Sequence, residues 1–163
     1  MITGPANLKA RSDGKKKQFI SVVEKINKMK GRDVDSLFHK HHDRYFRETD
    51  CTSCANCCRV LGPRLTYSDV KRLAAALKTG TAEIFDKYAA VDDDGDYVFR
   101  SMPCPFLQDD NLCSVYGSRP RACRDYPHTD RKKTGAIIKI CLRNTEICPV
   151  VFNIFDALSN ELK

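Results

Sequence analysis

The sequence predicts a small, α-rich α+β fold made of short helices and irregular loops. Apolar residues recur at helical spacing in several separate stretches, whereas a strand-like pattern is confined to residues 97–100. Proline and glycine interrupt the segments between these helices. Most of the nine cysteines fall in those irregular segments, so we expect the loops to surround one or two cysteine-bearing sites.

Composition narrows the class of protein. The chain has 163 residues, 30% of them charged, which suits a soluble globular domain with a modest core. No apolar run approaches the ~20 residues that span a bilayer, and the N-terminus lacks the apolar stretch of a secretory signal. We therefore expect a cytoplasmic protein with reduced thiols, and no membrane partner. Nine cysteines are also an odd number, which disulfides cannot pair completely.

The chain divides by composition into three predicted parts. Residues 1–17 are polar and basic without periodicity, and we expect a disordered, solvated arm in preference to a nucleic-acid-binding one. Residues 18–49 carry two amphipathic stripes, which predict an antiparallel pair of helices. Residues 50–163 contain every cysteine and form the predicted cysteine-cluster domain.

Within this third part, a few local signals predict regular elements. Thr66-x-x-Asp69 resembles a capping box, and Pro120 and Pro127 bound a short helical turn that carries Cys123. The predicted elements are a helix that follows Thr66 and is closed by Gly80, a short helix from Thr81 to about Ala89, a hairpin turn at 92–96, a strand at 97–100 and a final helix from about 145 to 162.

The motif Cys51-x2-Cys54-x2-Cys57-Cys58 places four thiols within eight residues. Thiolates are soft ligands that select zinc, copper(I) or iron–sulfur clusters. The spacing i, i+3, i+6 predicts that Cys51, Cys54 and Cys57 share one site. Neighbouring side chains of an extended backbone point to opposite faces, so we expect Cys58 to serve a second site or to lie in the core.

The remaining cysteines are single. Cys104, Cys113 and Cys123 are the expected partners of Cys58. Cys148 lies in the first turn of the predicted final helix, and a helix N-terminus is expected to depress the pKa of its thiol. Two four-thiolate sites leave one spare cysteine, and we assign Cys141 to that place. The predicted metal ligands are Cys51, Cys54, Cys57, Cys58, Cys104, Cys113, Cys123 and Cys148.

These motifs resemble the YkgJ-like cysteine-cluster family, described as a zinc- or iron-chelating domain. The resemblance spans roughly residues 50–160 and is carried by Cys51-x2-Cys54-x2-Cys57-Cys58, Pro103-Cys-Pro-Phe-Leu, Cys113-Ser-Val-Tyr and Arg119-Pro-x2-Cys-Arg-x-Tyr-Pro127. It implies metal binding. A flagellin lysine methylase is similar in its cysteine pattern, but the chain has no Gly-rich nucleotide fingerprint, so methyl transfer is the weakest alternative.

Two classes of function stay open at this point. The Cys-x2-Cys-x2-Cys run shares its opening spacing with bacterial ferredoxins, which favours a 4Fe-4S cluster and a redox role. The alternative is a structural or interaction module that is held together by zinc and performs no catalysis, although zinc sites usually contain separated Cys-x2-Cys pairs. We expect a protein or small-molecule partner of unknown identity, and we do not expect nucleic acid to be the partner. The pattern names no catalytic residue.

Removal of the metal is expected to unfold the cysteine-bearing part, residues 50–163, and to leave parts of the helices at 19–47. Metal binding supplies folding free energy when the site does not exist in the unfolded chain. Circular dichroism and thermal melting after chelation, with metal loss confirmed, measure the effect. An unchanged spectrum and melting temperature in metal-free protein would contradict the prediction.

Overall fold

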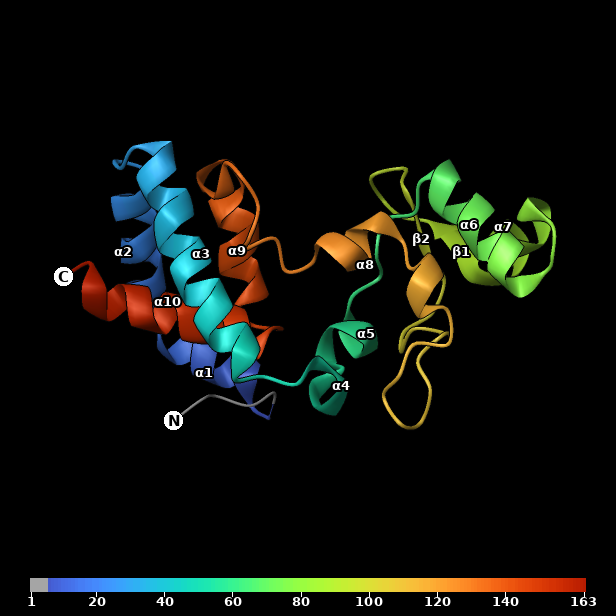
Figure 1. The fold of residues 1–163 in the computed structure, drawn as a ribbon, viewed down its shortest axis with the longest axis horizontal. Helices are drawn as coiled ribbons and strands as arrows, with labels where there is room; N and C mark the ends of the chain where they lie inside the picture. Colours follow the sequence, from blue (N-terminus) through green and yellow to red (C-terminus); the bar gives the residue numbers. More distant parts are fainter. Residues whose placement is uncertain (1–5) are drawn as a thin grey trace. The chain divides into compact units, whose positions relative to one another are not determined.

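The computed structural model describes residues 6–163, and it is built mainly from short helices with one small sheet (Figure 1). The elements in chain order are α1 (Leu8–Gly14), α2 (Lys16–Ile26), α3 (Gly31–Arg47), α4 (Cys51–Cys54), α5 (Asn56–Val60), α6 (Tyr67–Leu77), α7 (Thr81–Tyr88), β1 (Ala89–Val91), β2 (Tyr97–Phe99), η1 (Tyr116–Ser118), α8 (Arg121–Asp125), η2 (Thr134–Ile137), α9 (Ile138–Asn144) and α10 (Pro149–Glu161). The predicted α-rich α+β class is confirmed.

The chain folds as two compact units. Unit 1 contains the residues up to Cys54 together with Pro127–Lys163, and unit 2 contains Ala55–Tyr126. The sequence predicted a division near residue 50 with everything beyond it in one domain. The structure instead returns the C-terminal helices to the N-terminal ones, because their apolar faces complete one core.

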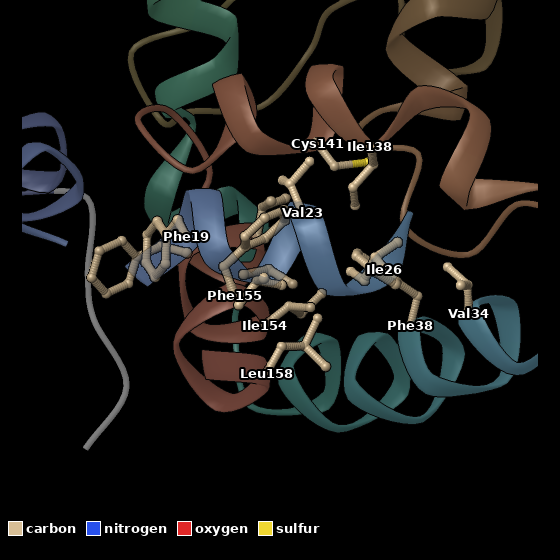
Figure 2. Packing of buried hydrophobic residues seen from close by; sticks show 14 of the residues in the cluster. Phe19, Val23, Ile26, Val34, Phe38, Ile138, Cys141, Ile154, Phe155 and Leu158 are labelled. Carbon is tan, nitrogen blue, oxygen red and sulfur yellow. The ribbon is translucent and has the colours of Figure 1, made fainter. Parts of the chain in front are cut away.

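Helix α10 is the centre of unit 1. Both α2 and α3 pack against it, and α9 packs against α2 and α10. Phe155 lies in the middle of this core with no exposed surface, and its ring packs edge-on against Phe19 and Phe38 at centroid distances of 5.6 and 6.1 Å (Figure 2). The predicted pair of helices at 18–49 is therefore held together through α10. The part of the chain expected to survive metal removal accordingly extends to α10.

The N-terminal stretch differs from its prediction. Where the sequence suggested a disordered arm, α1 begins at Leu8, whose side chain is buried, and Ser12 exchanges a 2.7 Å hydrogen bond with Thr145. One buried leucine in a seven-residue helix is too short a pattern for periodicity to reveal. The part of the prediction that concerns residues 1–5 lies outside the described residues.

Unit 2 has a separate core beneath α6, α7 and a two-stranded antiparallel sheet. Thr66 and Asp69 form the predicted capping box at the start of α6. Strand β2 agrees with its prediction, and the turn before it joins it to β1, which the sequence did not reveal. The buried side chains of this core are Leu65, Val70, Leu73, Ala74, Ile84, Ala89, Phe99, Phe106 and Val115.

Asp69 joins two elements of unit 2. Its side chain is 1% exposed and accepts hydrogen bonds from Thr66, from Arg72 and from the backbone N–H of Arg121 at 2.9 Å. Burial alone would raise its pKa, but these donors hold the pKa of the Asp69 carboxyl below its usual range. One carboxylate therefore caps α6 and fixes the first residue of α8, the helix that carries Cys123.

No helix in the described part of the chain combines the length and the apolar character needed to span a membrane.

Replacing Asp69 with Ala is expected to lower the free energy of unfolding of unit 2 by about 2–3 kcal/mol at pH 7, because hydrogen bonds to a buried charge are lost and Arg72 loses its ion-pair partner. Urea denaturation of the metal-loaded protein measures this change. Asp86→Ala, at an exposed position of α7, is the matched control and should alter stability little. Equal stability of the two variants would show that Asp69 does not anchor α8.

Candidate metal centre

Unit 2 gathers four of the predicted ligands: Cys58, Cys104, Cys113 and Cys123. The thiols of Cys58 and Cys113 act on the protonation of both Cys104 and Cys123, and Cys104 acts on Cys123, so these side chains are electrostatic neighbours. The backbone N–H of Cys104 donates to the carbonyl of Cys58 at 2.8 Å. Three separate segments of the chain thus contribute sulfur to one region.

A tight hairpin brings Cys104 and Cys113 together. Leu107 and Cys113 form an antiparallel bridge, and Ser114 donates its backbone N–H to the carbonyl of Phe106 at 2.9 Å. Burial raises the pKa of the Cys104 thiol, while the backbone N–H groups of Phe106 and Leu107 act in the opposite direction. Such N–H groups stabilise a thiolate and orient it, as the surroundings of metal-bound sulfur do.

The surroundings of Cys113 and Cys123 favour the neutral thiol. Burial raises the pKa of Cys113 against the N–H group of Val115, and it raises the pKa of Cys123 to about 12. The charge of Arg119 lowers the pKa of both thiols but does not compensate for burial. A buried thiol becomes a thiolate when a cation binds it, because the cation replaces the lost solvation.

Cys57 and Cys58 lie together in the short helix α5, with their sulfur atoms 4.0 Å apart. The expectation of an extended backbone that turns them to opposite faces is wrong, because successive side chains on a helix lie only about 100° apart. The thiol of Cys57 lowers the pKa of Cys58 to about 6, opposed by burial and assisted by Arg119 and Arg59. Of the four thiols Cys58, Cys104, Cys113 and Cys123, only Cys58 has a lowered pKa.

Unit 1 gathers three other predicted ligands, Cys51, Cys54 and Cys148. Asp50 positions the first two, because its carboxylate accepts hydrogen bonds from the backbone and the hydroxyl of Thr52 at the start of α4. Cys148 is the N-cap residue of α10, and Cys51 and Cys54 act on its protonation. The grouping of Cys57 with Cys51 and Cys54 stays a prediction from the spacing.

The expected depression of the pKa of Cys148 is wrong. Burial raises the pKa of this thiol to about 12, and the N–H groups of Val150 and Val151 at the start of α10 only partly oppose it. The sequence identified the helix N-terminus but not the burial, which comes from tertiary packing. Cys148 fits a ligand that loses its proton on metal binding, as coordinating thiols do.

Cys141 lies in the apolar core of unit 1. It has no exposed surface and packs among the apolar side chains of unit 1, beside Ile138 (Figure 2). Burial raises the pKa of its thiol to about 11. This environment suits the spare cysteine of the sequence prediction, since a buried free cysteine behaves as a small hydrophobic residue.

Within residues 6–163, no three His, Cys, Asp or Glu side chains stand in an arrangement that could hold a metal ion, and no disulfide joins any cysteine there. The chemistry of the residues nevertheless suits a bound metal ion or cluster. Soft sulfur donors occur in two sets, backbone N–H groups interact with the sulfur atoms, and the charge of an arginine acts on the set in unit 2.

The sequence indicated the roles of two supporting residues, Asp50 and Asp69, only in part. Asp50 precedes the first cysteine, as an N-cap residue precedes a helix, and the capping preference of aspartate was a usable signal. Asp69 was predicted to cap α6 alone. Its bond to the start of α8 joins residues 52 positions apart, and no local pattern indicates it.

A family model matches residues 50–142, more than half of the chain, and its family, CxxCxxCC, is described as a proposed zinc- or iron-chelating domain. The chain belongs to the CxxCxxCC family. The match contains Cys51, Cys54, Cys57 and Cys58 and extends through Cys123 to Cys141, so that of the predicted ligands only Cys148 lies beyond it. No curated protein and no solved structure matches this CxxCxxCC chain.

Single substitutions of Cys57 and Cys58 by Ser are each expected to lower metal content by affecting different sites. Cys57 continues the spacing of Cys51 and Cys54, whereas Cys58 neighbours the thiols of unit 2. Cys141→Ala should leave metal content unchanged and cost only packing energy, ~1–2 kcal/mol. Metal stoichiometry of the three variants is the measurement. Full metal in the Cys58 variant and partial loss in the Cys141 variant would reverse the assignment.

Proposed function

We propose that the chain is an iron–sulfur protein in which Cys58, Cys104, Cys113 and Cys123 hold a 4Fe-4S cluster. The observation that carries the proposal is the gathering of these four thiols, from three segments of chain, in one region of unit 2. Four cysteine thiolates are the usual ligands of such a cluster. Membership of a zinc- or iron-chelating family supports the same chemistry.

The surroundings of these thiols support a cluster of negative overall charge. Four thiolates bring more negative charge than the metal core offsets, and hydrogen bonds to sulfur and nearby cations then stabilise the site. The backbone N–H groups of Phe106, Leu107 and Val115 act on the sulfur atoms, and the guanidinium groups of Arg59 and Arg119 act on Cys58. Unit 2 therefore offers both kinds of support.

We propose a second site in unit 1 on Cys51, Cys54 and Cys148. Cys148 is fixed by its place at the start of α10, and Cys51 and Cys54 by the turn that Asp50 caps. The three-residue spacing of this run is the feature shared with bacterial ferredoxins. It is the reason to favour iron–sulfur over a single metal ion.

Zinc is the second candidate. Unit 2 has a small core of nine buried side chains, and Cys104 and Cys113 are partly buried against it. A closed four-thiolate zinc site stabilises small folds of this kind and performs no reaction. In that case the chain is a structural or interaction module, whereas a cluster gives it a one-electron redox role toward a protein or small-molecule partner in a reducing compartment such as the cytoplasm.

Protein purified without oxygen is expected to be brown and to contain iron and acid-labile sulfide in equal amounts. Iron should fall by about half in Cys123→Ser, because one of two proposed clusters loses a ligand. Iron, sulfide and zinc analysis, together with the visible spectrum, measures this outcome, and Cys141→Ala is the matched cysteine control. Colourless protein with stoichiometric zinc and no sulfide would establish the zinc alternative, and absence of both metals would refute the proposal.

A further inference from the structure

We infer that residues 129–134 of unit 1, which we call the basic loop, form an interaction surface for a carboxylate-rich face of a partner protein. The loop presents three consecutive cations, Arg131, Lys132 and Lys133, on a backbone that α3 holds in place. This inference does not depend on the proposed metal chemistry, because residues 129–134 contain no cysteine.

A polar stripe on α3 holds the basic loop. Asp35, His39 and His42 occupy positions i, i+4 and i+7 of this helix, so they lie on one face of it. Nε2 of His39 donates to the backbone carbonyl of Arg131 at 3.1 Å. Nδ1 of His42 shares a 2.8 Å hydrogen bond with the hydroxyl of Thr129. Separate residues of the stripe thus contact separate residues of the loop.

Asp35 fixes the last residues of the basic loop. Its carboxylate accepts the backbone N–H groups of Lys133 and Thr134 at 2.8 and 2.9 Å. The Thr134 hydroxyl in turn donates to the carbonyl of Arg131 at 2.7 Å. These contacts hold the backbone that carries the three cations and do not use their charged groups.

The backbone at Lys133 is in the left-handed region, with φ 60° and ψ 40°. Glycine adopts this conformation easily, whereas any larger residue is strained in it. The hydrogen bond from its N–H group to Asp35 helps to keep Lys133 there. Strained residues that their surroundings hold in place are concentrated at functional sites. We therefore attribute the presence of lysine here, in place of glycine, to its charge.

Burial divides the basic loop into anchors and exposed cations. Thr129 and Thr134, at its two ends, have no exposed surface. The three cations are exposed, and within residues 6–163 none of them forms an ion pair with a carboxylate. Asp130, the acidic residue of the loop, lies 4.0 Å from Nε2 of His42 instead. The positive charge of the loop is therefore available to a partner.

The charge of unit 1 has the same sign. In unit 2, ten lysine and arginine residues balance ten aspartate and glutamate residues, so the net charge of +7 belongs to unit 1. A positive field attracts acidic surfaces and increases the rate at which they associate. The loop adds a fixed set of donors at which such a surface can dock.

The chemistry of the basic loop favours a protein partner. Residues 129–134 include no aromatic side chain on which a base could stack and no aliphatic side chain that could enter a bilayer. Three consecutive residues extend over about 10 Å at most. This length suits a short group of carboxylates, which lysine and arginine bind by charge-assisted hydrogen bonds.

The test uses the full-length chain and a fluorescent oligoglutamate peptide, with binding followed by fluorescence anisotropy at several salt concentrations. The double variant Arg131→Gln/Lys132→Gln removes two charges of the loop. The control Lys16→Gln/Lys17→Gln removes two neighbouring exposed cations from α2 of the same unit. Duplex DNA and vesicles of anionic lipid are compared with the peptide at equal salt.

The loop double variant is expected to weaken peptide binding about fivefold, the effect of losing two exposed charge pairs. The α2 control should change binding much less. A loss in the control as large as in the loop variant would overturn the inference, as would no binding of the peptide by the unaltered chain. Tighter binding of DNA or vesicles than of oligoglutamate would show that the partner is not an acidic protein.

Two further variants separate the held backbone from simple charge. Asp35→Ala keeps every cation and makes the chain more positive, yet it should weaken binding about threefold because the loop is no longer preorganised. Lys133→Gly should also weaken binding, while its melting temperature stays the same or rises because glycine suits the left-handed backbone. Tighter binding by Asp35→Ala, with the fold confirmed by circular dichroism, would refute the role of α3. Unchanged binding by Lys133→Gly would refute the role of the Lys133 charge.

Discussion

Burial of sulfur is the constraint on which the candidate site depends. In unit 2 the surroundings favour the neutral thiol at Cys104, Cys113 and Cys123, and backbone N–H groups offset this preference only in part. Thiolates are stable there only if a cation lies among them. The partial burial that disfavours the free thiolate of these cysteines therefore suits a ligand that loses its proton when a metal binds.

The two units relate their thiols to apolar packing in different ways. In unit 1, Cys148 begins the helix on which the whole core is assembled, so the thiol group and the core share α10. In unit 2, the hairpin of Cys104 and Cys113 covers the edge of a much smaller core through Phe106 and Val115. Metal should contribute a larger share of the stability in unit 2, because less apolar surface is buried there.

Local sequence predicted the elements whose signals are local. The stripes of α2 and α3, the capping box of α6, and the short turn around Cys123 all follow from spacing and from proline positions. The cysteine motifs indicated the right chemistry for the same reason. They concentrate soft ligands within a few short segments of the chain.

The features that sequence missed depend on residues far apart in the chain. Packing of α2 and α3 on α10 has no local signal, and neither has the bond from Asp69 to the start of α8. Cys57 and Cys58 were expected to point to opposite faces of an extended backbone, but they lie in helix α5. The protonation of Cys148 depends on burial, which a helix N-terminus alone does not reveal.

The discontinuous course of unit 1 has a consequence for the newly made chain. In the sequence, one segment of unit 1 precedes unit 2 and the other follows it. The hydrogen bond between His41 and Glu161, both in unit 1, joins residues 120 positions apart. Unit 2 is continuous, so its segment leaves the ribosome whole while α2 and α3 still wait for α10. Because continuous domains fold as units during synthesis, unit 2 can acquire its structure and its metal first, and the apolar faces of α2 and α3 stay uncovered until the last helix emerges.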